Sequence, residues 1–226
     1  MSSSAQFPSL VMIIRHGEKP GNPSNDKEGG PNLSVLGSAR AAALPSLFTP
    51  DPTAKPAGKT PQLDCDMTAG TESQFKGAYG SSKLNAGPSR FPTPDFLFAT
   101  KSSNSSSRPV ETITPLAQAL QFINNNSAFK IHHHFKNDTK GINGLTSEIL
   151  KTPATYGGKV VLICWHHGAI LQLTKAFGVP SSQLPWSKWP GKVFDRIFCI
   201  NWDSGKASLA ADYQQLLYGD SAGESS

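Results

Sequence analysis

Residues 10–18 read Leu-Val-Met-Ile-Ile-Arg-His-Gly-Glu, a short apolar run that changes abruptly into a polar turn. Two further apolar runs have the same form: residues 96–99 and residues 160–164, each of which is also followed by polar residues. Short uninterrupted apolar runs predict strands that are buried on both faces, as in a parallel sheet.

Helical patterns follow these runs, so that strands and helices alternate along the chain. The expected helices begin after Ser34, at Arg108, near Leu145 and near Gly168, and further strands are expected at residues 129–134, 196–202 and 207–213. This order predicts an α/β fold: a three-layer α/β/α sandwich with a mostly parallel central sheet.

The residues of these helices predict one break and one buried face. Pro45 falls inside the first helical pattern, and because an internal proline costs about 3 kcal/mol, a kink or restart is expected there. In the second helix Leu116, Leu120 and Ile123 recur at helical spacing and are expected to face inward.

The length of 226 residues fits a single domain that spans residues 1–226. The chain has 20 glycines and 18 prolines, and many of them fall in residues 49–94, which we expect to form an irregular insertion. Structureless loops of this length are usually either disordered or functional. The tail, residues 219–226, is expected to be disordered.

Composition argues against several classes of protein. No apolar stretch approaches the roughly 18 residues of a membrane span, and the first nine residues have neither the basic nor the apolar region of a secretory signal. Three cysteines do not make a disulfide framework, so a reducing, cytoplasmic location is expected. The net charge of +5 is compatible with an anionic ligand, but dispersed basic residues predict neither nucleic acid nor membrane as a partner.

His132, His133 and His134 are adjacent possible metal ligands. Because successive side chains of a strand face opposite sides, these three imidazoles do not share one metal ion without distortion. An edge strand with exposed imidazoles is therefore expected rather than a zinc site, and no metal or other cofactor is expected.

Side chains suited to phosphate follow three of the expected strands. Arg15 and His16 end the first run, His166 and His167 end the third, and Arg108 follows the second after a serine-rich turn. Ligands of α/β sheets bind beyond the carboxyl ends of the strands, so these groups are expected to meet at one rim. Arginine guanidinium groups bind phosphate oxygens bidentately, and an unprotonated imidazole is a competent nucleophile toward phosphorus. This set of side chains therefore predicts phosphoryl chemistry.

Four blocks of the sequence resemble one known family. Residues 13–18 resemble the Arg-His-Gly signature of the histidine phosphatase superfamily, whose fold is phosphoglycerate-mutase-like. Residues 32–41 resemble its Leu-Ser/Thr-x-x-Gly-x-x-Gln/Arg-Ala helix, residues 107–112 its second arginine motif, and residues 160–170 the strand and turn that carry its second histidine. The resemblance implies a phosphoglycerate-mutase-like fold and a metal-independent phosphatase that acts through a phosphohistidine.

Carried over to this chain, the resemblance implies that His16 is the phosphorylated nucleophile. Arg15, Arg108 and a second histidine would form the phosphate pocket; a gapless match makes this His166, and His167 is the alternative. The general acid that protonates the leaving oxygen is unassigned, with candidates Glu18, Glu111 and Asp138.

The sequence also departs from the mutases of this family. After Arg-His-Gly they typically continue with Ser or Thr and a nearby Asn, whereas this chain has Glu18, Lys19 and Pro20. A phosphatase is therefore the main hypothesis, with a phosphorylated small molecule or a phosphoprotein as substrate. The alternatives are a phosphomutase that uses the same pocket and a non-catalytic module that binds a phosphorylated ligand.

Overall fold

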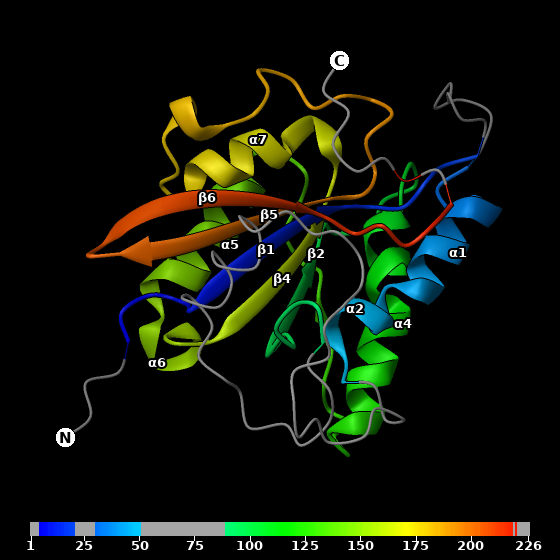
Figure 1. Ribbon diagram of the computed structural model, residues 1–226, viewed down its shortest axis with the longest axis horizontal. Helices are drawn as coiled ribbons and strands as arrows, with labels where there is room; N and C mark the ends of the chain where they lie inside the picture. The colour runs from blue at the N-terminus through cyan, green and yellow to red at the C-terminus, as the bar shows by residue number, and fades with distance from the viewer. Residues whose placement is uncertain (1–4, 21–29, 51–88, 219, 221–226) are drawn as a thin grey trace, which may run out of the picture.

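A computed structural model describes residues 5–20, 30–50, 89–218 and 220, and its centre is a six-stranded sheet (Figure 1). The strands lie in the order β3-β2-β4-β1-β5-β6. Their bounds are β1 Leu10–Arg15, β2 Phe96–Ala99, β3 Ile131–His132, β4 Val160–Trp165, β5 Arg196–Asp203 and β6 Lys206–Tyr213.

The sheet is parallel over four strands and antiparallel beyond them. β1 pairs in parallel with β4, β4 with β2, and β2 with β3, whereas β5 runs antiparallel to β1 and β6 antiparallel to β5. Three of the five pairings are thus parallel, which confirms the prediction of a mostly parallel sheet. β6 runs antiparallel to β5 because only a two-residue turn joins them, and parallel neighbours need a longer crossover.

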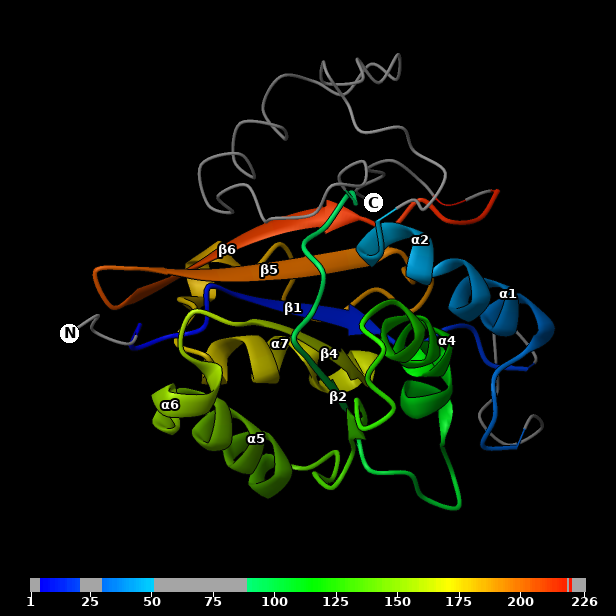
Figure 2. The ribbon, with the colours of Figure 1, turned by 90° about the horizontal axis from the view of Figure 1, so that it is seen from below.

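Helices cover both faces of the sheet (Figures 1 and 2). One face carries α1 (Val35–Ala43), α2 (Pro45–Phe48) and α4 (Arg108–Ile123), and the other carries α5 (Thr139–Lys151), α6 (Pro153–Tyr156) and α7 (His167–Ala176). Successive residues of β1 alternate between two buried clusters: Leu10, Met12 and Ile14 pack with the first group of helices, and Val11 and Ile13 with the second. The predicted three-layer α/β/α architecture is confirmed.

The expected break at Pro45 is confirmed, because α1 ends at Ala43 and α2 begins at Pro45. The expectation that Ile123 faces inward is wrong: Leu116 and Leu120 are fully buried, but Ile123 is 43% exposed. A helix of 16 residues is about 24 Å long, whereas the four residues of β2 span about 13 Å. The last turn of α4 therefore extends past the strand that its middle covers.

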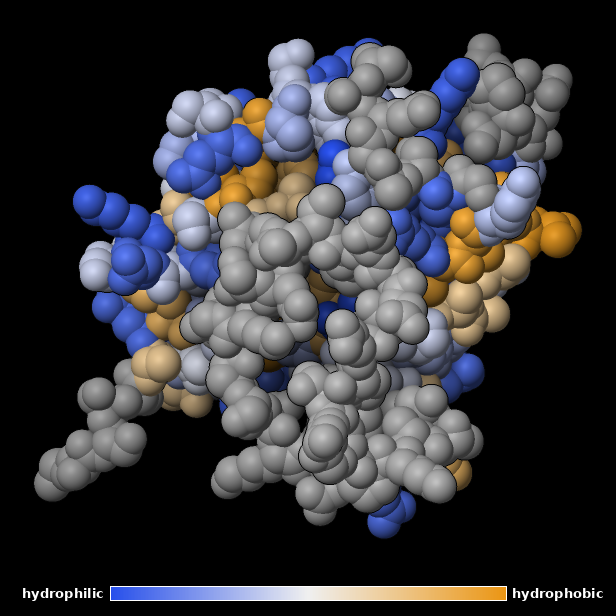
Figure 3. Space-filling model, in the orientation of Figure 1, coloured by the Kyte–Doolittle hydropathy of each residue, from blue (hydrophilic) through white to orange (hydrophobic). Residues whose placement is uncertain are grey.

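Two further elements differ in detail from the sequence pattern. The strand expected at residues 129–134 is only Ile131–His132, because β3 is an edge strand that pairs with just Leu97 and Phe98. On α1 the buried residues are Gly37, Arg40 and Ala41. Apolar side chains instead gather on the surface over α1, where Val35 is 91% exposed (Figure 3).

Most of the expected insertion at residues 49–94 lies outside the described residues, as does the expected disordered tail apart from Asp220. Where the chain is described again, Phe91 is buried and its N–H donates a hydrogen bond to the carbonyl of Leu47. In the described part of the chain, no helix combines the length and the apolar character needed to cross a membrane.

Candidate active site

A pocket of about 630 Å³ lies at the carboxyl ends of the parallel strands. It is lined by residues that follow β1, β2, β3 and β4: His16, Lys19, Lys101, Ser102, Ser103, Ser105, Ser106, Arg108, Lys136, Asn137, His166, His167 and Gly168. The structure thus brings together four of the residues predicted for the site, namely His16, Arg108, His166 and His167. No aspartate or glutamate is among the described residues that line the pocket.

The ring of His16 is held in one tautomer. Its Nδ1 lies 2.7 Å from the carbonyl oxygen of Gly17, and because a carbonyl only accepts, Nδ1 carries the proton. Burial lowers the pKa of His16 well below its ordinary value, and the nearby charges of His166, Arg15 and Arg108 lower it further. The ring is therefore neutral near pH 7, with the lone pair on Nε2, the form that a nucleophile requires.

His166 and His167 stand beside His16 at the start of α7. The ring centroid of His166 lies 5.2 Å from that of His16 in an edge-to-face arrangement, and the ring centroid of His167 lies 6.4 Å away. Burial is the main cause that lowers the pKa of each to about 4, with Arg108 adding to the effect on His166 and Arg15 to that on His167. Both rings are thus neutral near pH 7 while no anion is bound.

Arg108 enters the pocket from the first turn of α4. Its Nη1 donates to the carbonyl of Gly30 at 3.0 Å, and its Nη2 lies 3.4 Å from the carbonyl of Ser105. Its Nε is buried and has no hydrogen-bond partner among the described residues. The guanidinium is therefore fixed in place by two loops and keeps donor capacity for an anion.

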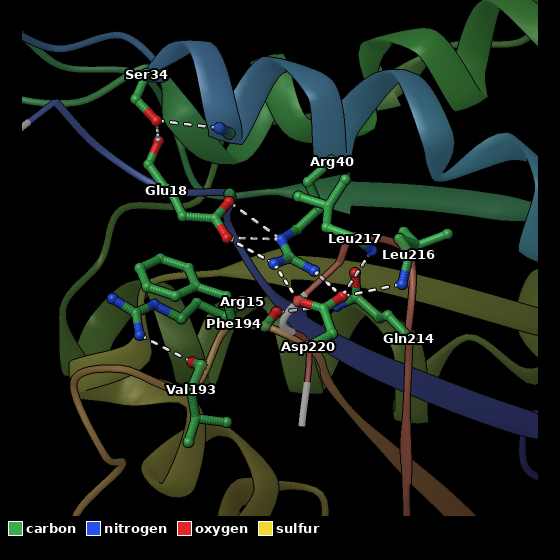
Figure 4. Close-up of polar contacts among 12 residues, drawn as sticks. Arg15, Glu18, Ser34, Arg40, Val193, Phe194, Gln214, Leu216, Leu217 and Asp220 are labelled. Atoms are coloured by element: carbon green, nitrogen blue, oxygen red, sulfur yellow. Dashed lines mark hydrogen bonds and ion pairs between the residues drawn. The ribbon is translucent and has the colours of Figure 1, made fainter. Parts of the chain in front are cut away.

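Arg15 lies behind the pocket rather than among the residues that line it. Its Nη1 donates to the carbonyls of Gly191 and Val193 at 2.7 and 2.9 Å, and its guanidinium stacks 3.5 Å from the ring centroid of Phe194 (Figure 4). Burial lowers its pKa to about 9, against an opposing effect of Glu18. Arg15 is close enough to lower the pKa values of His16, His166 and His167, so its charge acts on the pocket.

Glu18 follows His16 and Gly17 in sequence, but its carboxylate turns away into a buried ion-pair network (Figure 4). The Arg40 guanidinium contacts Glu18 Oε1 at 2.6 Å and Asp220 Oδ1 at 2.7 Å, and all three side chains are at least 92% buried. Glu18 does not line the histidine pocket. Its carboxylate accepts hydrogen bonds from Arg40, on the side away from the histidines, so it is not placed to give a proton to a leaving group in the pocket.

The other two candidate acids also have structural partners. Glu111 accepts from the backbone N–H of Leu33 at 2.8 Å and from the hydroxyl of Ser107 at 2.9 Å. Asp138 caps α5 by accepting from the N–H of Gly141 at 2.7 Å. Neither lines the pocket. Glu111 holds together the loops on either side of Arg108, and Asp138 fixes the start of a helix.

Thr112, which ends the motif at residues 107–112 but was given no role from the sequence, connects the two halves of the site. Its Oγ1 accepts from the backbone N–H of Gly17 at 2.9 Å and donates to the carbonyl of Arg108 at 2.7 Å. Gly37 packs so closely on the backbone of Glu18 that a Cβ there would overlap it. The two residues that follow His16 are thus held by α4 and α1.

The adjacent histidines at 132–134 lie at an edge of the sheet, as expected, and His133 and His134 are exposed. His134 Nε2 lies 3.3 Å from a carboxylate oxygen of Glu148. Among the residues that the structure describes, no group of three or more potential metal ligands is arranged to hold an ion.

Lys19, Lys101, Lys136 and Asn137 were not predicted as site residues. The signal for Lys101 was present, because this lysine comes two residues after the apolar run at Phe96–Ala99. Lys136 carried no such signal: residues 129–134 have a weak strand pattern, and only the pairing of β3 with β2 places Lys136 at the same rim.

No family model matches this sequence, and no curated protein matches it. Similar solved structures include the protein histidine phosphatase SixA complexed with tungstate (15% identity, TM-score 0.45, covering 91% of this chain and 97% of that one). Phosphoglycerate mutase from Bacillus anthracis (12%, TM-score 0.43, covering 92% and 94%) is another. A third is a phosphoserine phosphatase mutant from Entamoeba histolytica in complex with phosphoserine (10%, TM-score 0.41, covering 92% and 98%).

Two of these three structures are of phosphatases and one is of a phosphoglycerate mutase.

Proposed function

We propose that this chain is a metal-independent phosphatase that hydrolyses a phosphomonoester through a phosphohistidine on His16. The observation that carries the proposal is the hydrogen bond between His16 Nδ1 and the carbonyl of Gly17, because it leaves the lone pair on Nε2 of a ring that lines the pocket. Burial keeps this ring unprotonated near pH 7, which the attack on phosphorus requires.

The transferring phosphoryl group would be held by cations. Arg108 has an unpartnered buried Nε among the described residues, and His166 stands 5.2 Å from His16, centroid to centroid. A bound dianion favours the protonated form of a neighbouring imidazole, so His166 would gain a proton, and with it a second donor, when substrate binds. Arg15, which lies behind the pocket, adds positive potential there. These charges would stabilise the equatorial oxygens of the transition state.

The reaction would have two steps. In the first, Nε2 of His16 forms a bond to phosphorus while the bond from phosphorus to the ester oxygen breaks, and the leaving alkoxide takes up a proton. In the second, water attacks phosphorus and gives a proton to the group that protonated the leaving oxygen, the nitrogen–phosphorus bond breaks, and phosphate leaves. Transfer to a second alcohol in place of water would make the enzyme a mutase.

We propose His167 as the source of the proton for the leaving oxygen. Glu18, Glu111 and Asp138 are all engaged outside the pocket, whereas His167 lines it and lies farther from His16 than His166 does. A substrate dianion would raise the pKa of His167 from about 4 toward the range in which it carries a proton. General acid catalysis by a residue so placed typically contributes 10²–10⁴-fold.

The proposal can be tested by trapping the intermediate. The protein would be mixed with a ³²P-labelled phosphomonoester and quenched within milliseconds in alkali, in which a phosphoramidate survives. We expect label that is stable to alkali and lost in acid in the wild type. His16→Asn should carry none, and His133→Gln, which changes an exposed histidine outside the pocket, should be labelled like the wild type. Label that persists in His16→Asn, or a wild type with neither label nor turnover, would overturn the proposal.

We also propose a cytoplasmic location. Cys164 and Cys199 are free and buried, and burial raises the pKa of both thiols. Such thiols behave as small apolar groups, as expected in a reducing compartment.

A further inference from the structure

The pocket extends well beyond the place of the reacting phosphate. Its volume of about 630 Å³ lies within the range of sites for whole small molecules, roughly 300–1,000 Å³. His16 follows β1, whereas Lys136 follows β3, three places away in the sheet. Neighbouring strands are spaced by about 4.8 Å, so the two ends of this rim are roughly 14 Å apart. A substrate that fills the pocket therefore reaches past the histidines toward β2 and β3.

Two lysines occupy this far end. Lys101 comes shortly after β2 and Lys136 shortly after β3, and a backbone hydrogen bond of 2.7 Å from the N–H of Lys101 to the carbonyl of Phe135 joins the two segments. The chain at Lys136 is held in turn by α5, because Gly141 packs directly on its backbone and Asp138 caps the helix. Both lysines are thus placed by rigid backbone.

Neither lysine is neutralised by the protein. Both side chains are exposed, and in the described parts of the chain neither forms an ion pair with a carboxylate. The closest acid in sequence, Asp138, is engaged with the N–H of Gly141. The described lining of the pocket contains four cations, Lys19, Lys101, Arg108 and Lys136, and no carboxylate. An anion bound between Lys101 and Lys136 would supply a negative charge that the described lining of the pocket lacks.

We propose that Lys101 and Lys136 form a second anion subsite, so that the substrate is a small phosphomonoester with a second anionic group, either a phosphate or a carboxylate. This inference rests on the proposed function, because it takes the histidine end of the pocket as the place of the reacting phosphate. A lysine ammonium is a compact point charge without a fixed fork, so it accepts either kind of anion. Asn137 and the serines at 102–106 line the same part of the pocket and supply neutral hydrogen-bond partners.

The test compares two matched pairs of substrates. Glycerol 3-phosphate and 3-phosphoglycerate differ by a carboxylate, and fructose 6-phosphate and fructose 1,6-bisphosphate differ by a phosphate. In the wild type we expect kcat/KM to be higher for the second member of at least one pair, and the pair that shows it identifies the anion. A charge-assisted hydrogen bond is worth enough to make this ratio roughly tenfold or more. In the double variant Lys101→Gln/Lys136→Gln the ratio should fall to near one.

The control variant is Lys206→Gln. Lys206 is also an exposed lysine, but it begins β6 at the opposite end of the sheet, where β5 and β6 meet. It should leave the ratios of both pairs unchanged. Equal kcat/KM within both pairs in the wild type, or a preference that persists in the double variant, would overturn the proposal. Turnover of phosphopeptides but of none of the four small compounds would also overturn the proposal.

A binding measurement separates this inference from the proposed function. The same four compounds would be titrated into the His16→Asn protein by calorimetry, with and without Lys101→Gln/Lys136→Gln. If the phosphohistidine proposal fails but the subsite exists, the doubly anionic compounds still bind more tightly and the preference still depends on the two lysines. If hydrolysis is observed but neither binding nor turnover distinguishes the pairs, only the subsite is wrong.

Discussion

The side-chain oxygen of Thr112 accepts a hydrogen bond of 2.9 Å from the backbone N–H of Gly17, the residue after the candidate nucleophile. The same oxygen donates to the carbonyl of Arg108 at 2.7 Å. One hydroxyl therefore couples the turn that carries His16 to the helix start that carries Arg108. Because His16 and Arg108 both line the pocket, the distance between the candidate nucleophile and the arginine depends on this contact.

Thr112→Val is expected to lower kcat by about tenfold or more. Valine keeps the shape of the side chain but leaves the buried N–H of Gly17 without a partner, which costs about 1–3 kcal/mol. Thr112→Ser should restore most of the activity. Thr114→Val is the matched control, since the Thr114 hydroxyl bonds to the carbonyl of Val110 in the same helix but not to the His16 turn. Steady-state kinetics would contradict the prediction if both valine variants behaved alike.

Arg40→Met is expected to lower the free energy of unfolding by about 3–5 kcal/mol, because it leaves Glu18 and Asp220 as buried carboxylates without their cation. Lys159→Met removes one partner of an exposed ion pair, Lys159 with Asp95, whose side chains are 48% and 40% exposed. The expected loss there is below about 1 kcal/mol. Urea unfolding of both variants measures the difference. Equal losses would show that the buried network adds no more than a surface pair.

The stability of the protein is expected to fall as the pH is lowered from about 6.5 toward 4. The pKa values of His166 and His167 are lowered to about 4 in the folded chain, while an unfolded histidine titrates near 6.5. Between these values the unfolded state binds more protons, so the stabilisation is complete above 6.5 and is lost on acidification. Melting temperatures across this range should fall less steeply in His166→Gln than in the wild type. A slope unchanged by this substitution would refute the assignment.

Sulfate provides a second measurement of the same histidines. It is a dianion throughout this pH range, so it binds better when the imidazoles are protonated. Added sulfate should raise the melting temperature of the wild type more at pH 5 than at pH 7. The difference should shrink in His166→Gln and persist in His133→Gln, which alters an exposed ring at the sheet edge. General stabilisation by sulfate would act equally on both variants.

Substitution of the two histidines at the start of α7 should separate their roles. His167→Gln is expected to slow hydrolysis of alkyl phosphates by about 10²–10⁴-fold, because alkoxides need a proton to leave. With 4-nitrophenyl phosphate, whose leaving group is stable as an anion, the loss should be small. His166→Gln should impair both substrates, because this residue is proposed to bind the phosphoryl group itself. The reverse pattern would exchange the two roles.

The sequence by itself determined the layers of the fold and four of the residues that meet in the pocket. Buried strands and amphipathic helices are local patterns: the apolar runs at β1, β2 and β4 favour buried strands, and Pro45 separates the end of α1 from the start of α2. Parallel strands place their carboxyl ends at one rim, so the parallel pairing of β1 with β4 brings His16 and His166 together.

Only the tertiary structure decided what each charged side chain contacts. Glu18 stands two residues from His16, yet its carboxylate pairs with Arg40, 22 residues away, and through it with Asp220. Lys136 reaches the pocket because β3 pairs with β2. A strand of only two residues has too short a sequence pattern to predict this pairing. A charge is stabilised by whichever partner the packed chain brings within a few ångströms, and that partner is set by the arrangement of whole elements rather than by neighbours along the chain.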